Sequence, residues 1–465
     1  MKTIFKLLMT ILAGIVLGFV FTVLAYTIPV NRIEKNVKSC VERYNDEGRF
    51  HEIVPSWHLS WADHFTDSII LSTTMCDSKE SLIKRAMKNQ RIEYEGALDA
   101  YHNLIYYYLG SDLTQGKEVS DTSAYLSPEE EIVDRQNYTP YAYSRYWNGY
   151  VVFLKPILYL FDFSVVYILN AGAQLFLIAA IIYMMWKRNK RLYIIPFVLA
   201  LISVSPYSSF NSFQLSSIMY ITYITLLVML IKEKEIKNCN AYIYVFAVNG
   251  ICVAYFDLLT SPVLAIGWPL VLYCIQNKEI DNIKKVKKIF GYSLAWLTSY
   301  ILMWVSKIIL ATMLTGQNVL KNAYEAFVYR SGGKTKQFSN GILSDSSFEI
   351  DLEESIKYSI KYKDILVRNL YAYLPIGITI MIIVALVIGF YLVYDSRKKL
   401  NRQSLLITLP YMFISLYPFV WLFLFKNHSY GHYYFVSRIL SVTLLAVLCM
   451  LINICQPENE NTAKK

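Results

Sequence analysis

Residues 7–30 read LLMTILAGIVLGFVFTVLAYTIPV, an unbroken apolar run that follows Lys2 and Lys6. A helix needs about 20 apolar residues to cross a hydrocarbon core, and this run is long enough. Secretory signal cores have only about 7–15 apolar residues and end at a small-x-small cleavage site, which is not evident here. We therefore interpret residues 1–30 as an uncleaved signal anchor and first transmembrane helix.

The composition of the whole chain is also strongly apolar. Of the 465 residues, 55% are hydrophobic and 17% are charged, and the mean hydropathy is +0.35. Soluble domains carry about 25% charged residues, so this composition indicates a membrane protein. The net charge of +10 comes from short basic segments between apolar runs, without a basic stripe interleaved with aromatic residues. This pattern argues against nucleic acid as a partner.

Apolar runs dominate the chain after residue 150. Residues 151–160 are too short to span a membrane alone and are expected to lie at its interface. Nine longer runs follow, at residues 164–186, 192–204, 215–231, 241–258, 262–275, 290–314, 373–394, 405–425 and 434–454. We predict an all-α polytopic membrane protein with roughly ten transmembrane helices and a large external loop subdomain after the first span.

The charges of the short loops predict an orientation in the cell membrane. Segments rich in Lys and Arg alternate with segments that have almost none; the basic ones are 187–191, 232–237, 277–288 and 396–402, and the others are 205–216, 258–262 and 426–434. The positive-inside rule then places both termini in the cytoplasm and the working face outside.

This orientation divides the chain into regions. Residues 31–150 form the large external loop, in which the stretches 65–76 and 80–110 are amphipathic and read as short helices. Residues 151–455 form a multi-span membrane bundle with a second external loop at 315–370. Residues 456–465 form a cytoplasmic tail.

Cysteine spacing gives little support for metal or redox chemistry. None of the seven cysteines is paired at the close spacing of a zinc site or a redox motif. Cys40 and Cys76 both fall in the large external loop, where they form either one disulfide or two unpaired buried residues.

The segment WHLSWADHFTDS at residues 57–68 holds the first candidate site. In a helix, Asp63 and Asp67 share one face because they are four residues apart. One of these carboxylates can act as a catalytic base that takes a proton from an attacking hydroxyl, while Trp57 and Trp61 offer flat faces for stacking a sugar. The alternative is that Asp63 caps a helix and the Trp residues anchor the chain at the interface.

The segment YAYSRYWNGY at residues 141–150, followed by Lys155 within an apolar run, holds the second candidate. Arg145 and Lys155 form a cationic pair that suits the phosphate of a lipid-linked substrate, and Trp147 is a further stacking residue. Alternatively, Arg145 meets lipid headgroups and Lys155 extends to the interface.

The segment NHSYGHYYFVSR at residues 427–438 is dense in polar and aromatic groups. Arg438 stands at the outer end of the last span, where a cation needs compensation. We expect His432 and Arg438 to contact phosphate. His428 and His432 lack the pattern of a metal-binding HExxH motif, so no metal ligands are assigned, although a divalent cation is left open as a cofactor.

The layout resembles the GT-C class of integral-membrane glycosyltransferases, which have a first span, a large external loop with acidic residues and then spans joined by short loops. That class uses polyprenyl-phosphate-linked sugars, and this chain likewise has no Gly-rich phosphate loop. The segments 144–150 and 427–438 also resemble membrane proteins of bacterial polysaccharide biosynthesis. The acidic motif of the class would fall on Asp63 or Asp67, which are spaced DxxxD here rather than adjacent.

The resemblance implies an enzyme of the cell envelope. It would transfer a sugar from a lipid-linked donor to a cell-surface glycan or lipid-linked acceptor on the external face, among membrane lipids. Two alternatives share the substrate: a flippase or transporter, and a polymerase for lipid-linked oligosaccharides. The first usually shows internal repeats, which are not found, and the second more naturally has its large loop late in the chain.

Overall fold

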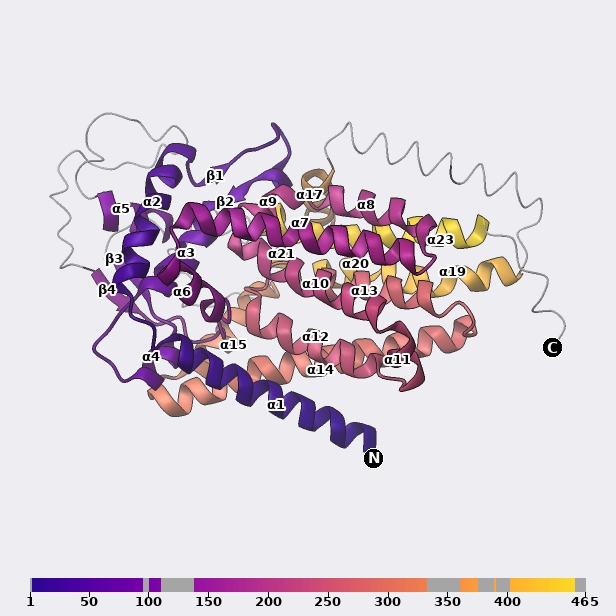
Figure 1. Cartoon of the computed structure of the whole chain (residues 1–465), viewed down its shortest axis with the longest axis horizontal. Helices are drawn as coiled ribbons and strands as arrows, with labels where there is room; N and C mark the ends of the chain where they lie inside the picture. Colours follow the sequence, from indigo (N-terminus) through magenta and orange to yellow (C-terminus); the bar gives the residue numbers. More distant parts are fainter. Residues whose placement is uncertain are drawn as a thin grey trace.

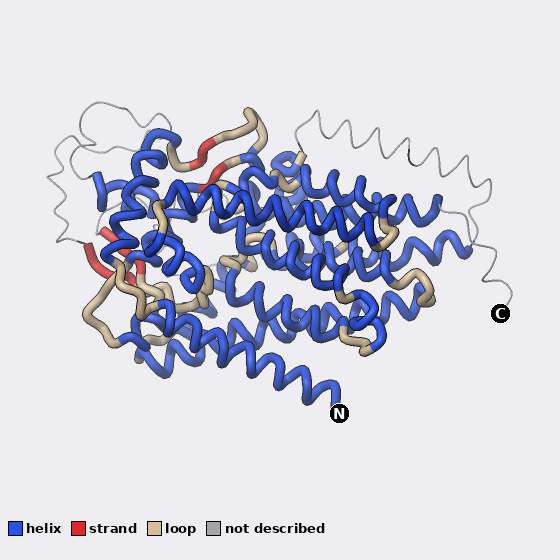
Figure 2. The backbone as a smooth tube through the Cα atoms, in the orientation of Figure 1, coloured by secondary structure: helices blue, strands red, loops and turns tan. Residues whose placement is uncertain are grey.

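The computed structural model describes residues 2–94, 100–109, 138–332, 360–374, 389 and 402–455. Over this part of the chain the fold is mostly helical, and its only strands form two small antiparallel pairs (Figure 2). Strand β1 (Phe50–His51) pairs with β2 (Ala62–Asp63), and β3 (Arg91–Tyr94) pairs with β4 (Tyr138–Tyr141).

Six helical segments of the described chain are long and apolar enough to cross a membrane. They are α1 (Lys2–Ala25), α7 (Phe163–Lys187), α10 (Phe213–Ile231), α14 (Asn282–Thr315), the pair α19 (Arg402–Ser415) and α20 (Tyr417–Leu424), and the run α22 (Tyr433–Val436), η5 (Ser437–Leu440) and α23 (Ser441–Cys455). The prediction of a helical multi-pass membrane protein is confirmed at this level.

The remaining apolar helices are shorter. They are α6 (Val151–Leu160), η4 with α8 (Arg191–Tyr193 and Ile194–Ser203), α12 (Tyr242–Phe256) and α13 (Pro262–Gln276). Helix α6 matches the interfacial run at 151–160, and the others match the predicted spans at 192–204, 241–258 and 262–275, whose crossing of the membrane stays a prediction. The predicted span at 373–394 falls almost entirely outside the described residues, as do the tail at 456–465 and most of the basic segment at 396–402.

Close backbone contact holds the bundle together at α12 and α14. A Cβ added to Gly250 would lie 2.4 Å from the carbonyl oxygen of Trp296, so only glycine permits this approach. The neighbouring Asn249 donates to Thr225 Oγ1 at 2.8 Å and accepts from Trp296 Nε1 at 2.7 Å. Small residues and interhelical hydrogen bonds of this kind stabilise helix packing where lipid replaces water.

The basic loops meet at one end of the bundle. Lys190 pairs with Glu233 at 2.9 Å, and Lys237 pairs with Glu279 at 3.3 Å. These contacts join the segments 187–191 and 277–288 to α11 (Glu233–Asn238). In Figure 1, α1 begins and α23 ends toward this side, so three of the four basic segments share one end, as their charge pattern predicts.

The region 31–150 packs against the opposite end of the bundle (Figure 1). Its described helices are α2 (Asn31–Glu47), η1 (His58–Ser60), α3 (His64–Met75), α4 (Leu82–Lys88) and α5 (Ala100–Leu109). All of α3 is buried, so this region forms one continuous assembly with the bundle. The expected helix at 65–76 is found as α3, whereas the expected helix at 80–110 is wrong, because strand β3 pairs with β4 and interrupts it.

Shorter helices complete the same end. They are α9 (Pro206–Phe210), α15 (Val319–Arg330), α17 (Tyr362–Tyr373) and α21 (Lys426–Gly431). Of the predicted external loop at 315–370, residues 333–359 lie outside the described chain. Cys40 and Cys76 are both buried and free, so the disulfide alternative is not present.

Candidate functional site

Three turns with few basic residues converge with the segment 57–63 at the end of the bundle away from the basic loops. Elements β2, α9, α17 and α21 lie close together there (Figure 1). Hydrogen bonds tie these turns together: Ser208 Oγ to the Leu59 carbonyl (2.7 Å), Ser261 Oγ to the Phe435 carbonyl (2.9 Å) and His428 Nε2 to the Leu259 carbonyl (2.9 Å). Segments far apart in sequence therefore build one surface.

A group of aromatic side chains, which we name the aromatic wall, forms part of this surface. It consists of Phe50, His58, Trp61, Tyr433 and Tyr434. The Trp61 ring stacks on Phe50 at 5.3 Å, and His58 meets Trp61 edge-on at 4.7 Å and Tyr433 at 5.5 Å. Phe50, His58 and Trp61 are partly exposed, whereas both Tyr rings are buried. Binding sites use such aromatic surfaces together with a few polar groups that fix orientation.

Two polar atoms of the wall lack a hydrogen-bond partner among the described residues. Trp61 Nε1 and His58 Nδ1 have no hydrogen-bond partner in the described chain, although both atoms are buried. Burial lowers the pKa of His58, and the positive charge of Arg368 adds to this effect against the opposing charge of Glu52. His58 therefore favours the neutral form.

Arg368 on α17 adds a cation beside the wall. Its guanidinium lies 4.4 Å from the ring centre of Tyr430 and 4.2 Å from that of Tyr433. No ion pair or hydrogen bond to it is found within the described residues. A guanidinium stacked on two rings presents its donors as a planar fork suited to phosphate. Sequence reasoning missed Arg368, because it belongs to no motif and its two Tyr partners lie more than sixty positions away.

Asp63 lies directly behind the wall. It pairs with Phe50 in the β1–β2 ladder, and it caps α3 by accepting Thr66 N at 2.9 Å and Thr66 Oγ1 at 2.8 Å. Only 2% of the residue is exposed. Burial raises the pKa of Asp63 to about 6, against the opposing effects of the Thr66 hydrogen bonds and of the charges of Arg49 and Arg438. The carboxyl group therefore titrates close to neutral pH.

Asp67 holds the first turn of α10. It is fully buried, and its two oxygens accept the backbone N–H groups of Phe213 at 3.0 Å and Gln214 at 3.1 Å. Burial and the charge of Asp63 raise the pKa of Asp67 well above its usual value. Between the two carboxyl groups, Asp63 loses its proton more readily.

Arg438 is a buried crosslink. Its guanidinium donates to three backbone carbonyls, those of Val204 (3.1 Å), Tyr434 (2.8 Å) and Leu59 (2.5 Å). These bonds compensate the cation that the sequence leaves unexplained at the end of the last span. Its positive charge also opposes the rise in the pKa of Asp63 that burial causes. Arg438 therefore stabilises the ionised form of Asp63 from the buried side of the site.

Two other predicted residues lie at the same end. The His432 ring stacks on Phe435 at 5.1 Å and lies 4.8 Å from the His428 ring. Trp57 is buried and donates from Nε1 to the Tyr373 carbonyl at 3.2 Å, so it fixes η1 against α17 and offers little face to a ligand.

The other three predicted residues lie elsewhere, each with partners of its own. Lys155 donates to the carbonyl of Thr74 at 2.7 Å, at the far end of α3 from Asp63. With a rise of 1.5 Å per residue, the two ends are about 16 Å apart. Trp147 Nε1 donates to the Met303 carbonyl at 2.7 Å, and Arg145 Nη1 donates to Asn322 Oδ1 at 2.9 Å. Arg145, Trp147 and Lys155 thus do not share the aromatic wall.

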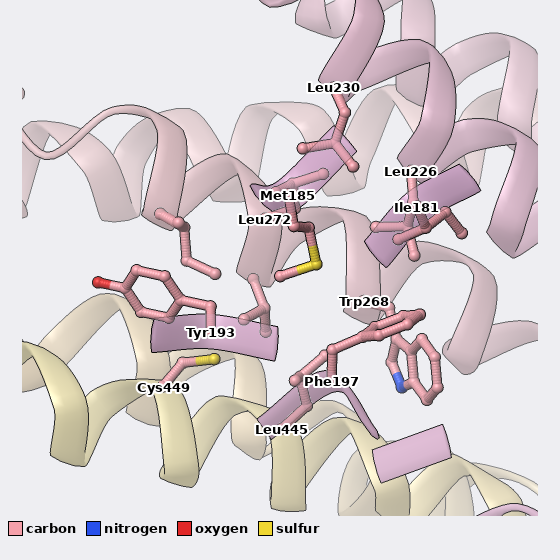
Figure 3. A pocket seen from close by; sticks show the side chains of 12 residues that line it. Ile181, Met185, Tyr193, Phe197, Leu226, Leu230, Trp268, Leu272, Leu445 and Cys449 are labelled. Carbon is pink, nitrogen blue, oxygen red and sulfur yellow. The ribbon is translucent and has the colours of Figure 1, made fainter. Parts of the chain in front are cut away.

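An apolar pocket lies elsewhere, inside the bundle (Figure 3). It encloses about 20 Å³ and is lined by side chains such as Met185, Phe197, Leu226, Trp268 and Cys449. This volume holds about one water molecule, and an apolar lining leaves it dry. None of the predicted site residues lines it, so we regard it as a packing defect of the core.

Within the described chain, no group of three or more His, Cys, Asp or Glu side chains is arranged to hold a metal ion. No position for a divalent cation is therefore assigned.

Comparison with known proteins gives no family assignment. The resemblance to the GT-C class therefore rests on the layout and the residues of this chain alone. No protein-family model, curated protein or solved structure matches the chain.

Proposed function

We propose that the protein is a membrane glycosyltransferase that moves a sugar from a polyprenyl-phosphate-linked donor to a glycan or lipid-linked acceptor on the external side of the cell membrane. One observation carries the proposal. Asp63, a carboxyl group that titrates near pH 6, stands directly behind a partly exposed aromatic wall, joined to it through its β-ladder partner Phe50. A base and a stacking surface are therefore adjacent.

The wall and its neighbour Arg368 supply binding. A sugar ring places its apolar face on Trp61 and Phe50. Its hydroxyl groups pair with Trp61 Nε1 and His58 Nδ1, which are buried without a partner in the described chain, once these side chains turn toward the ligand. The phosphate of the donor meets Arg368, whose guanidinium makes only ring contacts within the described chain. Charge-assisted hydrogen bonds from arginine to phosphate are among the strong ones in proteins.

In the proposed reaction the acceptor hydroxyl attacks the anomeric carbon of the donor sugar. The bond from that carbon to the phosphate oxygen breaks, polyprenyl phosphate leaves, and Asp63 takes the hydroxyl proton. Ionised Asp63 is available at neutral pH because its pKa is about 6. Thr66 Oγ1 now occupies one Asp63 oxygen at 2.8 Å, and the acceptor hydroxyl takes its place.

Asp67 and Arg438 have positioning roles in this proposal. Asp67 fixes the start of α10, and Arg438 holds the Leu59 carbonyl, so both keep the segment that carries Trp61 and Asp63 in place. Both Asp67 oxygens and the Arg438 guanidinium are bound to backbone groups, whereas one Asp63 oxygen is bound by the Thr66 hydroxyl.

The test compares the surface glycan and lipid-linked intermediates of three cell lines by mass spectrometry. One lacks the protein, one carries the wild type and one carries Asp63→Asn. Asparagine is itself a favourable N-cap, so this variant keeps the cap of α3. We expect Asp63→Asn to lower transfer by at least about 100-fold and to accumulate the acceptor that lacks one sugar.

Two results would overturn the proposal. Transfer at the wild-type rate by Asp63→Asn would exclude the proposed base. Accumulation of a complete lipid-linked unit in cells without the protein would indicate translocation or polymerisation instead. Glu42→Gln is the matched control, because it removes an exposed carboxylate on α2 and should leave the glycan unchanged.

A further inference from the structure

Two arginine side chains meet at one tyrosine, in a place that the aromatic wall does not include. Arg330, the last residue of α15, donates from Nη1 to the Tyr146 hydroxyl. The guanidinium carbons of Arg330 and Arg145 each lie 5.6 Å from the centre of the Tyr146 ring. Arg145 and Tyr146 are both buried, with 6% of each residue exposed. Two cations and a hydroxyl group therefore converge from two separate segments.

The loop that carries Arg145 and Tyr146 is held rigidly. Four hydrogen bonds fix it to the residue after α4, to α12, to α14 and to the turn before α15: Asn89 Nδ2 to the Tyr146 carbonyl (2.7 Å), Gly149 N to the Tyr255 carbonyl (2.8 Å), Trp147 Nε1 to the Met303 carbonyl (2.7 Å) and Ser144 Oγ to Gln317 Oε1 (2.9 Å). The two side chains are thus held in place before any ligand binds, which lowers the entropic cost of binding.

The local field at Tyr146 is positive. Burial raises the pKa of Tyr146, but the charges of Arg330 and Arg145 outweigh burial and lower it below the usual value. With both guanidinium carbons 5.6 Å from the Tyr146 ring centre, an anion placed beside Tyr146 would be stabilised by the same two charges.

We propose that Arg330, Arg145 and Tyr146 form a second anion site that binds the phosphate of a lipid-linked acceptor. Phosphate suits the site because guanidinium groups hold it by paired hydrogen bonds and a tyrosine hydroxyl can donate a third. Arg330 makes no other hydrogen bond in the described chain, so the rest of its planar fork is available.

The surroundings of Arg330 favour a lipid as the carrier of that phosphate. Arg330 continues the buried face of α15 after Ala326, while a neighbouring face of the same helix is apolar and exposed, with Leu320 at 64%, Tyr324 at 66% and Phe327 at 51%. In a membrane protein such a face lies against acyl chains and headgroups. A lipid beside α15 therefore brings its headgroup close to Arg330.

The position relative to Arg368 distinguishes acceptor from donor. Helix α21 lies between the two sites, because Asn427 donates to the Tyr329 carbonyl of α15 at 2.6 Å and Asn369 of α17 donates to the Ser429 carbonyl at 2.8 Å. One phosphate is thus held on each side of α21. The inference rests on the proposed function only for assigning one lipid as donor and the other as acceptor.

The test measures binding of polyprenyl phosphate to the full-length protein in nanodiscs by titration, without any turnover. We expect two sites in the wild type, loss of one in Arg330→Gln and loss of the other in Arg368→Gln, each weakened at least about tenfold. Lys321→Gln is the matched control, because Lys321 is an exposed cation on the same helix, at 4.0 Å from Glu325. It should keep both sites.

Thermal midpoints report folding of each variant. If Arg330→Gln does not fold, Arg330→Lys replaces it, since lysine keeps the charge without the planar fork and should still weaken binding, whereas Lys321→Arg should not. A single site that Arg330→Gln leaves unchanged would overturn the inference. Displacement of the lipid by equal concentrations of inorganic phosphate would overturn its assignment to a lipid.

The outcome of the lipid-binding test does not depend on the catalytic role proposed for Asp63. Asp63→Asn touches neither anion site, so it should abolish transfer and keep two-site binding. Loss of transfer chemistry with two sites intact would count only against the proposed function, and one-site binding with normal transfer would count only against the second site.

Discussion

The carboxylate of Asp67 accepts the backbone N–H of Phe213 at 3.0 Å, across 146 positions of sequence. Its other oxygen accepts the N–H of Gln214, so one buried side chain of α3 caps the first turn of α10. The first N–H groups of a helix have no partner within it and carry partial positive charge. Asp67 therefore joins the region 31–150 to the bundle, and Asp63 remains the proposed base.

This cap predicts that Asp67→Asn lowers stability. Asparagine offers one acceptor oxygen, and its amide nitrogen then faces a backbone N–H, so one buried donor loses its bond. We expect a loss on the order of 1–3 kcal/mol, seen as a lower midpoint of thermal unfolding in detergent. Glu42→Gln, on the exposed side of α2, should keep the wild-type midpoint. An unchanged midpoint in Asp67→Asn together with lost transfer would instead make Asp67 the base.

The base assignment predicts how transfer depends on pH. A base acts only when deprotonated, and burial raises the pKa of Asp63 to about 6. The rate should therefore fall about tenfold per pH unit below that value and level off above it. The measurement is the initial rate of sugar transfer by the reconstituted protein across about pH 5 to 8. A rate that is flat over this range in the wild type would contradict the role of Asp63.

Hydropathy predicts the bundle well because it is a local property. The predicted runs 164–186 and 215–231 are found as α7 (Phe163–Lys187) and α10 (Phe213–Ile231). The prediction of a helix over residues 80–110 is wrong because the structure there depends on a contact between distant segments. Its pattern reads as a helix, but Arg91 pairs with Tyr141, fifty residues later, and a ladder formed at that distance leaves no local signal.

The candidate site likewise combines features that a local sequence pattern predicts with contacts that it does not. The DxxxD spacing of Asp63 and Asp67 is visible in the sequence, but only Asp67 lies within α3, because Asp63 ends β2 and caps the helix. Their separate roles are not visible, because the partners of Asp67 are two backbone groups of α10. Arg368 could not be found from sequence either, since nothing near it in the chain indicates the rings of Tyr430 and Tyr433.

Lys155 offers a test that separates a structural cation from a ligand-binding one. It is fully buried and donates to the Thr74 carbonyl at 2.7 Å, with its ammonium group 4.7 Å from the Tyr26 ring. Removing it leaves a buried carbonyl unpaired, so Lys155→Met should cost about 1–3 kcal/mol of stability while transfer per folded molecule stays unchanged. Thermal midpoints and rates normalised to folded protein decide this. A normal midpoint with weakened lipid binding would place Lys155 on the substrate.

The orientation of the chain can be tested with its own cysteines. Cys239 is exposed at the end of α11, among the basic loops, whereas Cys40 and Cys76 are buried. Lys363 is exposed on α17, at the end that carries the aromatic wall. If the positive-inside rule sets the orientation, a membrane-impermeant maleimide should label Lys363→Cys on intact cells and should reach Cys239 only after the membrane is opened. The control is Lys363→Cys in a Cys239→Ser background, which should label equally before and after permeabilisation. Labelling of Cys239 on intact cells would reverse the orientation and place the aromatic wall, Asp63 and both anion sites on the cytoplasmic side.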